Sequence, residues 1–189
     1  MLIFSCCLFL CLTLVVTGKE KKPIVQERKS CCSTEQFAEL TSDKSFRNAH
    51  LEPTSLNFTP TIGKWITLKT ADGTDAKIFE VPSNKPTNNV IFMIHEWWGL
   101  NEYIQREAEQ LQQSLPNVTV IALDLYDGKI ATDRETAGKY MSSVSKQRCE
   151  TIIRAAIVHV GSKAKIGTIG WCFGGGWSLQ ATLLAGRQA

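Results

Sequence analysis

The stretch GWCFGGG at residues 170–176 constrains the fold of this chain more than any other part of the sequence. It places Cys172 among four glycines and two bulky aromatic residues, whereas a buried structural cysteine needs no glycine around it. KIGTIG, directly before it, has the pattern of a strand, and residues 175–184 have that of a helix. A strand, a very tight turn and a helix are the setting of a nucleophile elbow, G-x-S-x-G in its serine form. We therefore predict that Cys172 takes the serine position, between Gly170 and Gly174.

The chemistry of such an elbow explains the composition of the turn. The nucleophile projects away from the sheet, and neighbouring Cβ atoms would clash with the strand or the helix. The N-terminus of the following helix favours the thiolate form of Cys172. It also offers the Phe173 backbone N–H to a developing oxyanion. The alternative interpretation is a glycine-rich packing turn that carries an inert cysteine.

The order of the remaining elements predicts the fold class. Two strands around Ala71-Asp72-Gly73-Thr74 predict a β-hairpin. The patterns predict strands at 65–68, 76–81, 90–94, 118–123 and 165–170, and helices at 102–114 (capped by Asn101), 133–160 and 175–184 (carrying Leu179, Ala181 and Leu183). A hairpin followed by alternating strands and helices indicates an α/β fold, with a mostly parallel sheet covered by helices on both faces.

A second motif, His95-Glu96-Trp97-Trp98-Gly99-Leu100, follows the strand at 90–94 directly. It is not the zinc motif HExxH, because Gly99 stands where the second histidine would be. The loop after this strand supplies the other oxyanion donor in a sheet that carries a nucleophile elbow, and the Trp97 N–H is the candidate. We assign His95 no role in proton transfer.

Three stretches together, IHEWWGL, IALDLYDGK at 121–129 and IGWCFGGG, resemble the dienelactone hydrolase family in content, order and spacing. The resemblance covers roughly residues 63–189. It implies the α/β-hydrolase fold and the cleavage of small esters or lactones through a thiol acyl-enzyme, with no cofactor. The partner it implies is a small-molecule ester or lactone substrate.

The same resemblance implies roles for individual residues. Glu96 would contact the Cys172 nucleophile and hold it as a neutral thiol until substrate arrives. Trp98 and Tyr126 would line the substrate pocket. Some family members carry an arginine after the LDLY run that binds a substrate carboxylate. This chain has Asp127-Gly128-Lys129 there, which makes specificity for acidic dienelactones doubtful unless Lys129 substitutes.

The residues after Cys172 depart from the family pattern. A catalytic triad in this fold follows the order nucleophile, acid, histidine, but FGGGWSLQATLLAGRQA contains neither Asp nor His. His50 and His159 precede the nucleophile, and we do not expect either to replace the missing histidine. The expectation is the N-terminal part of a longer hydrolase, truncated after the elbow helix and a poor catalyst. The alternative is a non-catalytic binding or interaction protein of the same fold.

The N-terminal third divides into two parts before the partial α/β-hydrolase domain at 63–189. Residues 2–16 are uncharged and apolar, too short for a spanning helix but suited to a signal peptide at 1–18. Export to the periplasm or medium is therefore expected, with a short membrane anchor as the alternative. Residues 19–62 are predicted to be a polar linker with a short helical piece at 35–40.

Composition excludes several other classes of protein. The net charge is only +3 and no basic stripe is interleaved with aromatic residues, so nucleic-acid binding is unsupported. No pair of cysteines has CxxC spacing and the three histidines do not cluster with cysteines in sequence, so no metal site is expected. Apart from the leader segment, no membrane partner is expected.

Overall fold

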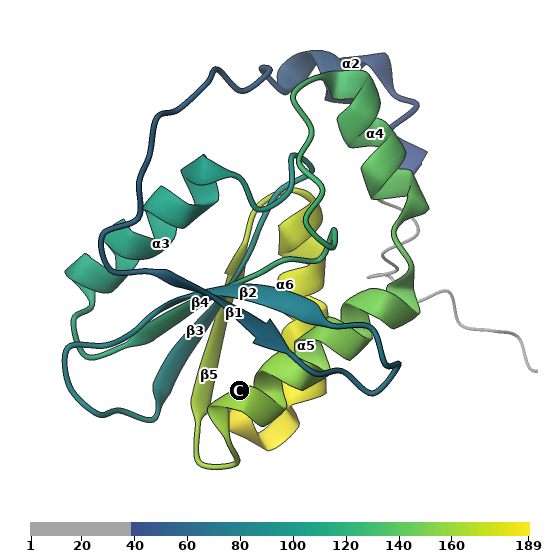
Figure 1. Ribbon diagram of the computed structural model, residues 1–189. Helices are drawn as coiled ribbons and strands as arrows, with labels where there is room; N and C mark the ends of the chain where they lie inside the picture. Colours follow the sequence, from purple (N-terminus) through teal and green to yellow (C-terminus); the bar gives the residue numbers. More distant parts are fainter. Residues whose placement is uncertain (1–38) are drawn as a thin grey trace, which may run out of the picture.

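The computed structural model describes residues 39–189, where five strands form a sheet in the order β1-β2-β4-β3-β5 (Figure 1). β1 (Lys64–Leu68) and β2 (Ala76–Val81) form the predicted antiparallel hairpin. β3 (Asn89–Ile94) lies between β4 (Thr119–Leu123) and β5 (Lys165–Gly170) and runs parallel to both, as predicted. The hairpin joins them through an antiparallel β2–β4 pair, so the sheet is mixed. The predicted α/β fold class is confirmed.

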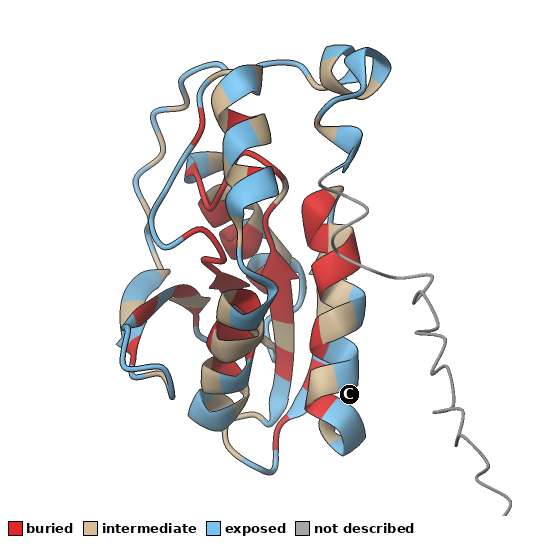
Figure 2. Ribbon diagram, turned by 90° about the vertical axis from the view of Figure 1, so that its right-hand side faces the viewer, coloured by how far each residue is buried: buried red, intermediate tan, exposed pale blue. Residues whose placement is uncertain are grey.

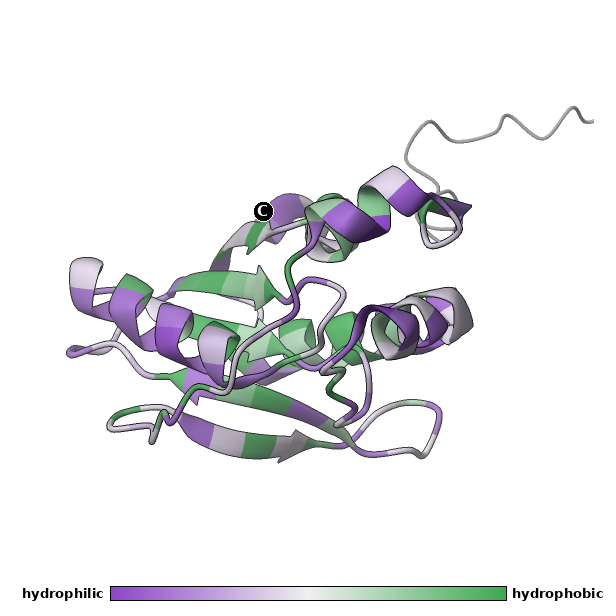
Figure 3. Cartoon of the chain, turned by 90° about the horizontal axis from the view of Figure 1, so that it is seen from above, coloured by the Kyte–Doolittle hydropathy of each residue, from purple (hydrophilic) through white to green (hydrophobic). Residues whose placement is uncertain are grey.

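Helices cover both faces of the sheet because successive strand residues point to opposite sides and are apolar on both. In β3, Phe92 and Ile94 pack beneath α5 (Lys146–Val160) and α6 (Phe173–Ala185). Met93 faces the other way, toward α3 (Glu102–Ser114). Figure 2 shows the buried residues gathered on the strands and on the inward sides of the helices. Seen from above, apolar strands lie between helices with hydrophilic outer faces (Figure 3).

Local capping fixes where the helices begin. The Asn101 side chain accepts a hydrogen bond from the Ile104 N–H at 3.3 Å and starts α3, as predicted. The stretch predicted as helical at 133–160 contains two helices, α4 (Arg134–Ser143) and α5. Ser145 separates them, because its side-chain oxygen accepts the Arg148 N–H at 3.4 Å and begins a new helix.

Helix α6 begins at Phe173, two residues before the predicted start at 175. Of the apolar residues predicted on this helix, Ala181 is fully buried, whereas Leu179 and Leu183 are 55% and 72% exposed. Trp177 takes the inward position four residues before Ala181, because residues four apart share one face of a helix. The helix therefore buries an aromatic and alanine stripe and leaves two leucines in solvent.

The chain before β1 packs on the domain. Glu39 and Leu40 are helical, and the rest of the short helix predicted at 35–40 lies outside the described residues, as does the predicted signal peptide at 1–18. Helix α2 (Lys44–Ala49) follows. The Glu109 carboxylate then holds the segment leading into β1, accepting backbone N–H groups from residues 61–63 at 2.7–2.8 Å. Among residues 39–189, no helix combines the length and apolar character needed to cross a membrane.

The start of α6 lies directly against the end of β3, and glycine makes this approach possible. A Cβ on Gly174 would collide with the backbone carbonyl oxygens of Ile94 and His95. A Cβ on Gly170 would collide with the backbone of Gly174 itself. Glycine at the two elbow positions is therefore a steric requirement of the fold, as the sequence pattern predicts.

We expect Gly174→Ala to lower the free energy of unfolding by about 1–3 kcal/mol, because the methyl group forces the helix away from β3. Gly175→Ala is the matched control, since its Cβ would meet the nearest atom, the Gly170 carbonyl oxygen, at 3.6 Å. Alanine there should be neutral or stabilise by up to about 1 kcal/mol. Urea unfolding followed by circular dichroism measures both, and equal midpoints for the two variants would contradict the steric argument.

Candidate active site

The carboxyl ends of the three parallel strands meet at one edge of the sheet, where ligands bind in open α/β folds. Ile94 in β3 is in register with Leu123 of β4 and with Gly170 of β5. The three loops that follow these residues therefore begin side by side. They are the HEWWG loop at 95–99, the DLYDG loop at 124–128 and the elbow at 170–174.

Cys172 stands on the turn between β5 and α6, at the N-cap position of the helix. Its backbone has φ +51° and ψ −117°, a conformation that residues other than glycine rarely adopt. Strain of this kind costs roughly 1–3 kcal/mol and persists where the surrounding structure fixes it, most often at functional sites. The cysteine is thus held in the strained geometry that an elbow requires.

The Cys172 sulfur lies within a constellation of groups from two loops. Burial raises the pKa of the thiol, a hydrogen bond from the Phe173 N–H lowers it, the Glu96 carboxylate raises it, and a hydrogen bond from the Trp97 N–H lowers it. The net pKa lies above the ordinary value, so the resting group is a neutral thiol at pH 7. The structure therefore brings together the four residues predicted from the sequence, Cys172, Glu96, Trp97 and Phe173.

Glu96 itself is partly buried at this position. Burial raises the pKa of its carboxyl, and the charge of His50 lowers it by a smaller amount. The His50 ring lies 4.8 Å from the Trp97 ring, and its Nδ1 donates to the Phe46 carbonyl at 2.6 Å. His50 thus lies beside the site, although its place in a polar N-terminal segment gave no signal of this.

His95 is fully buried and makes two hydrogen bonds that define its tautomer. Its Nδ1–H donates to the Glu96 carbonyl at 2.6 Å, and its Nε2 accepts the Leu125 N–H at 3.2 Å. Burial lowers the pKa of His95 to about 4, so the ring is neutral at pH 7. The imidazole also stacks on Phe173 at 5.7 Å. Both nitrogens are engaged, which agrees with the expectation that His95 transfers no proton.

Tyr126 belongs to the DLYDG loop, and its ring contacts His95 of the HEWWG loop and Phe173 of the elbow. Its ring packs edge-on against His95 at 4.6 Å, and its hydroxyl is buried without a hydrogen-bond partner in the described part of the chain. Burial raises the pKa of the phenol, and so does its electrostatic interaction with Cys172. The Asp124 carboxylate shapes this loop by accepting the Tyr126 N–H at 3.1 Å. The phenol hydroxyl is thus a buried polar group near the sulfur that has no partner in the described part of the chain.

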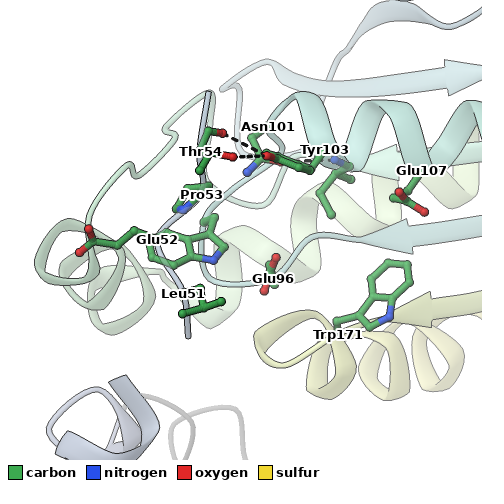
Figure 4. A pocket seen from close by; sticks show the side chains of 11 residues that line it. Leu51, Glu52, Pro53, Thr54, Glu96, Asn101, Tyr103, Glu107 and Trp171 are labelled. Carbon is green, nitrogen blue, oxygen red and sulfur yellow. Dashed lines mark hydrogen bonds between the residues drawn. The ribbon is translucent and has the colours of Figure 1, made fainter. Parts of the chain in front are cut away.

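A pocket of about 600 Å³ opens beside Glu96 (Figure 4). Of the two residues predicted to line a substrate pocket, Trp98 lies in its wall, whereas Tyr126 lines a separate cavity of about 180 Å³. Residues Leu51–Thr54 also line the pocket, which sequence patterns did not indicate. In Figure 4 the Glu96 carboxylate lies between this segment and Trp171, the residue before Cys172. No group of three or more His, Cys, Asp or Glu in the described chain is placed to hold a metal ion.

Comparison with known proteins bears on the family and the fold. The model of the dienelactone hydrolase family matches residues 76–188. A protein of Aquifex pyrophilus, Protein usf, is 30% identical over 98 residues, which are 47% of this chain and 42% of that protein. A crystal structure of a candidate dienelactone hydrolase from Klebsiella pneumoniae matches with a TM-score of 0.51 at 18% identity, over 60% of this chain and 50% of the other. The chain thus spans about half the length of the relatives it matches.

Replacing Glu96 by glutamine should make Cys172 more reactive. The substitution removes the negative charge that raises the thiol pKa, so the thiolate fraction at pH 7 increases. We expect alkylation by iodoacetamide to be roughly three- to tenfold faster, with the pH profile moved to lower pH. Glu102→Gln, an exposed change at the start of α3, is the control and should leave the profile unchanged. A slower reaction or an unmoved profile in Glu96→Gln would contradict this account of the sulfur.

Proposed function

Because the chain belongs to the dienelactone hydrolase family, we propose that it attacks small esters or lactones through Cys172 and forms a thioester with the acyl group. The single observation that carries the proposal is the environment of the sulfur. A strained elbow cysteine receives hydrogen bonds from two backbone N–H groups, those of Trp97 and Phe173, that come from different loops. Only the second of these groups belongs to the helix that follows the cysteine.

The acylation step needs few groups, and they are all present. The thiol gives its proton to water, and the thiolate attacks the ester carbonyl carbon. The carbonyl oxygen then carries the negative charge, and the two backbone N–H groups that contact the resting sulfur stabilise it. When the C–O bond to the leaving group breaks, the alkoxide or phenolate departs and the acyl group remains on sulfur. Substrate that displaces Glu96 from the sulfur would remove the charge that keeps the thiol neutral.

Two aromatic residues are proposed to contact the substrate in different ways. Trp98 offers an apolar wall to the pocket. The Tyr126 hydroxyl borders the neighbouring cavity and not this pocket, and it has no hydrogen-bond partner in the described part of the chain. Because the phenol interacts electrostatically with Cys172, it is proposed to donate to a substrate oxygen held at the sulfur. A buried hydroxyl without a partner is costly, and a substrate acceptor would remove that cost.

Release of the acyl group should be slow in these 189 residues. Deacylation requires a base that activates water, and the loss of such a unit typically costs about 10⁴–10⁶ in rate. His95 uses both ring nitrogens in hydrogen bonds, and His159 lies 2.7 Å from Glu80 at the far strand β2. His50 interacts with Glu96, but it is not among the groups that act on the Cys172 sulfur. The proposed activity of the chain is therefore acylation without efficient turnover.

We expect p-nitrophenyl acetate to give a burst of about one p-nitrophenolate per chain, followed by very slow release. The burst should disappear in Cys172→Ala, because the attacking sulfur is gone. Cys149→Ala is the matched control, since Cys149 is fully buried and burial raises its pKa strongly.

Stopped-flow absorbance measures the burst amplitude in all three proteins, after thermal unfolding has shown that each is folded. A burst of wild-type size in Cys172→Ala, or its loss in Cys149→Ala alone, would refute the assignment of the nucleophile.

A further inference from the structure

We propose that the pocket beside Glu96 selects uncharged or cationic apolar substrates and disfavours substrates that carry a carboxylate. This inference rests on the proposed function and names its substrate class. It draws on three features of the pocket: the segment that forms its outer wall, its apolar lining and the sign of the charges around it.

The outer wall belongs to residues 51–54, which precede the region matched by the family model. Contacts at both ends hold this segment in place. Thr54 Oγ1 lies 2.9 Å from the Tyr103 hydroxyl, which also donates to the Thr54 carbonyl at 3.2 Å (Figure 4). At the other end, Arg134 Nε donates to the His50 carbonyl at 2.8 Å. The wall is therefore a fixed part of the pocket, and its side chains contribute to specificity.

The lining is mainly apolar. Its apolar residues are Leu51, Pro53, Trp98, Ile104 and Trp171. Leu51 is 81% exposed and Trp171 is 43% exposed, so both offer apolar surface that a bound ligand could cover. Such surface favours the hydrocarbon part of an ester, because binding removes apolar area from water.

The charged residues that line the pocket are all acidic: Glu52, Glu96 and Glu107. Two of them have cationic partners, Arg134 at 3.6 Å from Glu52 and Arg106 at 3.0 Å from Glu107, but neither arginine lines the pocket. Lys129, the sequence candidate for binding a substrate carboxylate, lies 5.8 Å over the Tyr140 ring and lines other cavities. A substrate carboxylate would lose water here without gaining a cation, which is unfavourable.

The test measures access to Cys172 without any ester. Methanethiosulfonate reagents react when the thiolate attacks their sulfenyl sulfur, a disulfide forms and sulfinate leaves. Methyl, ethylammonium and sulfonatoethyl reagents supply a neutral, a cationic and an anionic probe. For each probe, the rate of reaction with Cys172 is divided by its rate with a free cysteine peptide. This relative rate should be lowest for the anionic probe, about tenfold below that of the neutral probe.

Matched substitutions then assign the effect to the pocket. Glu52→Gln and Glu107→Gln should narrow the difference between anionic and neutral probes, whereas Glu102→Gln should leave it unchanged. An anionic probe that reacts as fast as the neutral one would overturn the proposal, as would equal ratios in all three variants. If the anionic probe reacts more slowly but p-nitrophenyl acetate gives no p-nitrophenolate burst, the charge preference of the pocket is supported and only the proposed acylation is refuted.

A separate observation concerns His95. We infer that His95 is a positioning residue for the oxyanion donors. The carbonyl that accepts its Nδ1–H belongs to the peptide bond between Glu96 and Trp97, and the N–H of that same peptide bond contacts the Cys172 sulfur. A peptide unit is planar, with its C=O and N–H pointing in opposite directions. Holding the oxygen therefore sets the direction of the N–H, and hydrogen bonding at one end strengthens the donor at the other.

The hydrogen bond at the second ring nitrogen of His95 fixes the tautomer that this arrangement requires. The Leu125 N–H occupies Nε2, so the proton must reside on Nδ1, where it points at the Glu96 carbonyl. The loop after β4 thereby fixes the tautomer that orients the loop after β3. His95 acts on the reaction only through the Trp97 N–H, and it never touches the substrate.

Two polar substitutions separate the two nitrogens. His95→Asn places an amide N–H near the Nδ1 position and should retain most of the acylation rate and the alkylation pH profile of Cys172. His95→Gln reaches the Nε2 position instead, so acylation should slow by about tenfold or more and the alkylation profile should move to higher pH.

Thermal unfolding shows whether each variant folds, and His95→Phe, which keeps the stacked ring, replaces the glutamine variant if that one does not. The inference would be overturned if His95→Asn and the variant without the Nδ1 donor showed the same acylation rate and the same alkylation profile. A purely structural role for His95 predicts no difference between these two variants.

Discussion

The close approach of α6 to the end of β3 is the constraint on which the rest of this structure depends. Because Gly174 lies against the Ile94 and His95 carbonyls, the helix can begin immediately after the strand, and Cys172 is forced into a positive φ. The same approach brings the Phe173 N–H and the HEWWG loop to one sulfur. A side chain at Gly174 would separate the two loops, and with them the two backbone N–H groups that are proposed as oxyanion donors.

The Cys172 sulfur is under opposing influences, of which those that raise its pKa prevail. Burial and the Glu96 carboxylate raise the pKa of the thiol, whereas the two N–H groups lower it. The resting state is therefore neutral, and a neutral thiol is a poor target for oxidation. The groups that lower the pKa are the ones that would stabilise an oxyanion in the reaction. In the proposed reaction, the two N–H groups that contact the resting sulfur would bind the substrate oxyanion instead.

Sequence patterns predicted the fold and the centre of the site because both depend on short-range features. The elbow glycines, the Asn101 cap and the apolar strands each act within a few residues. The break at Ser145 was missed because a single serine cap competes weakly with helical periodicity. The pocket wall at 51–54 and the position of His50 were missed for a different reason. They depend on contacts with α3 and α4, far along the chain, that leave no periodic trace in a polar segment.

The account centres on Cys172 as an acylated nucleophile, and the acyl group can be located directly. After brief reaction with p-nitrophenyl acetate, the protein would be quenched in acid, digested with pepsin and mapped by mass spectrometry. The account predicts an acetyl group on the peptide that carries Cys172, labile to hydroxylamine at neutral pH as a thioester is. An acetyl group confined to lysines or to another cysteine, with the Cys172 peptide unmodified, would contradict it.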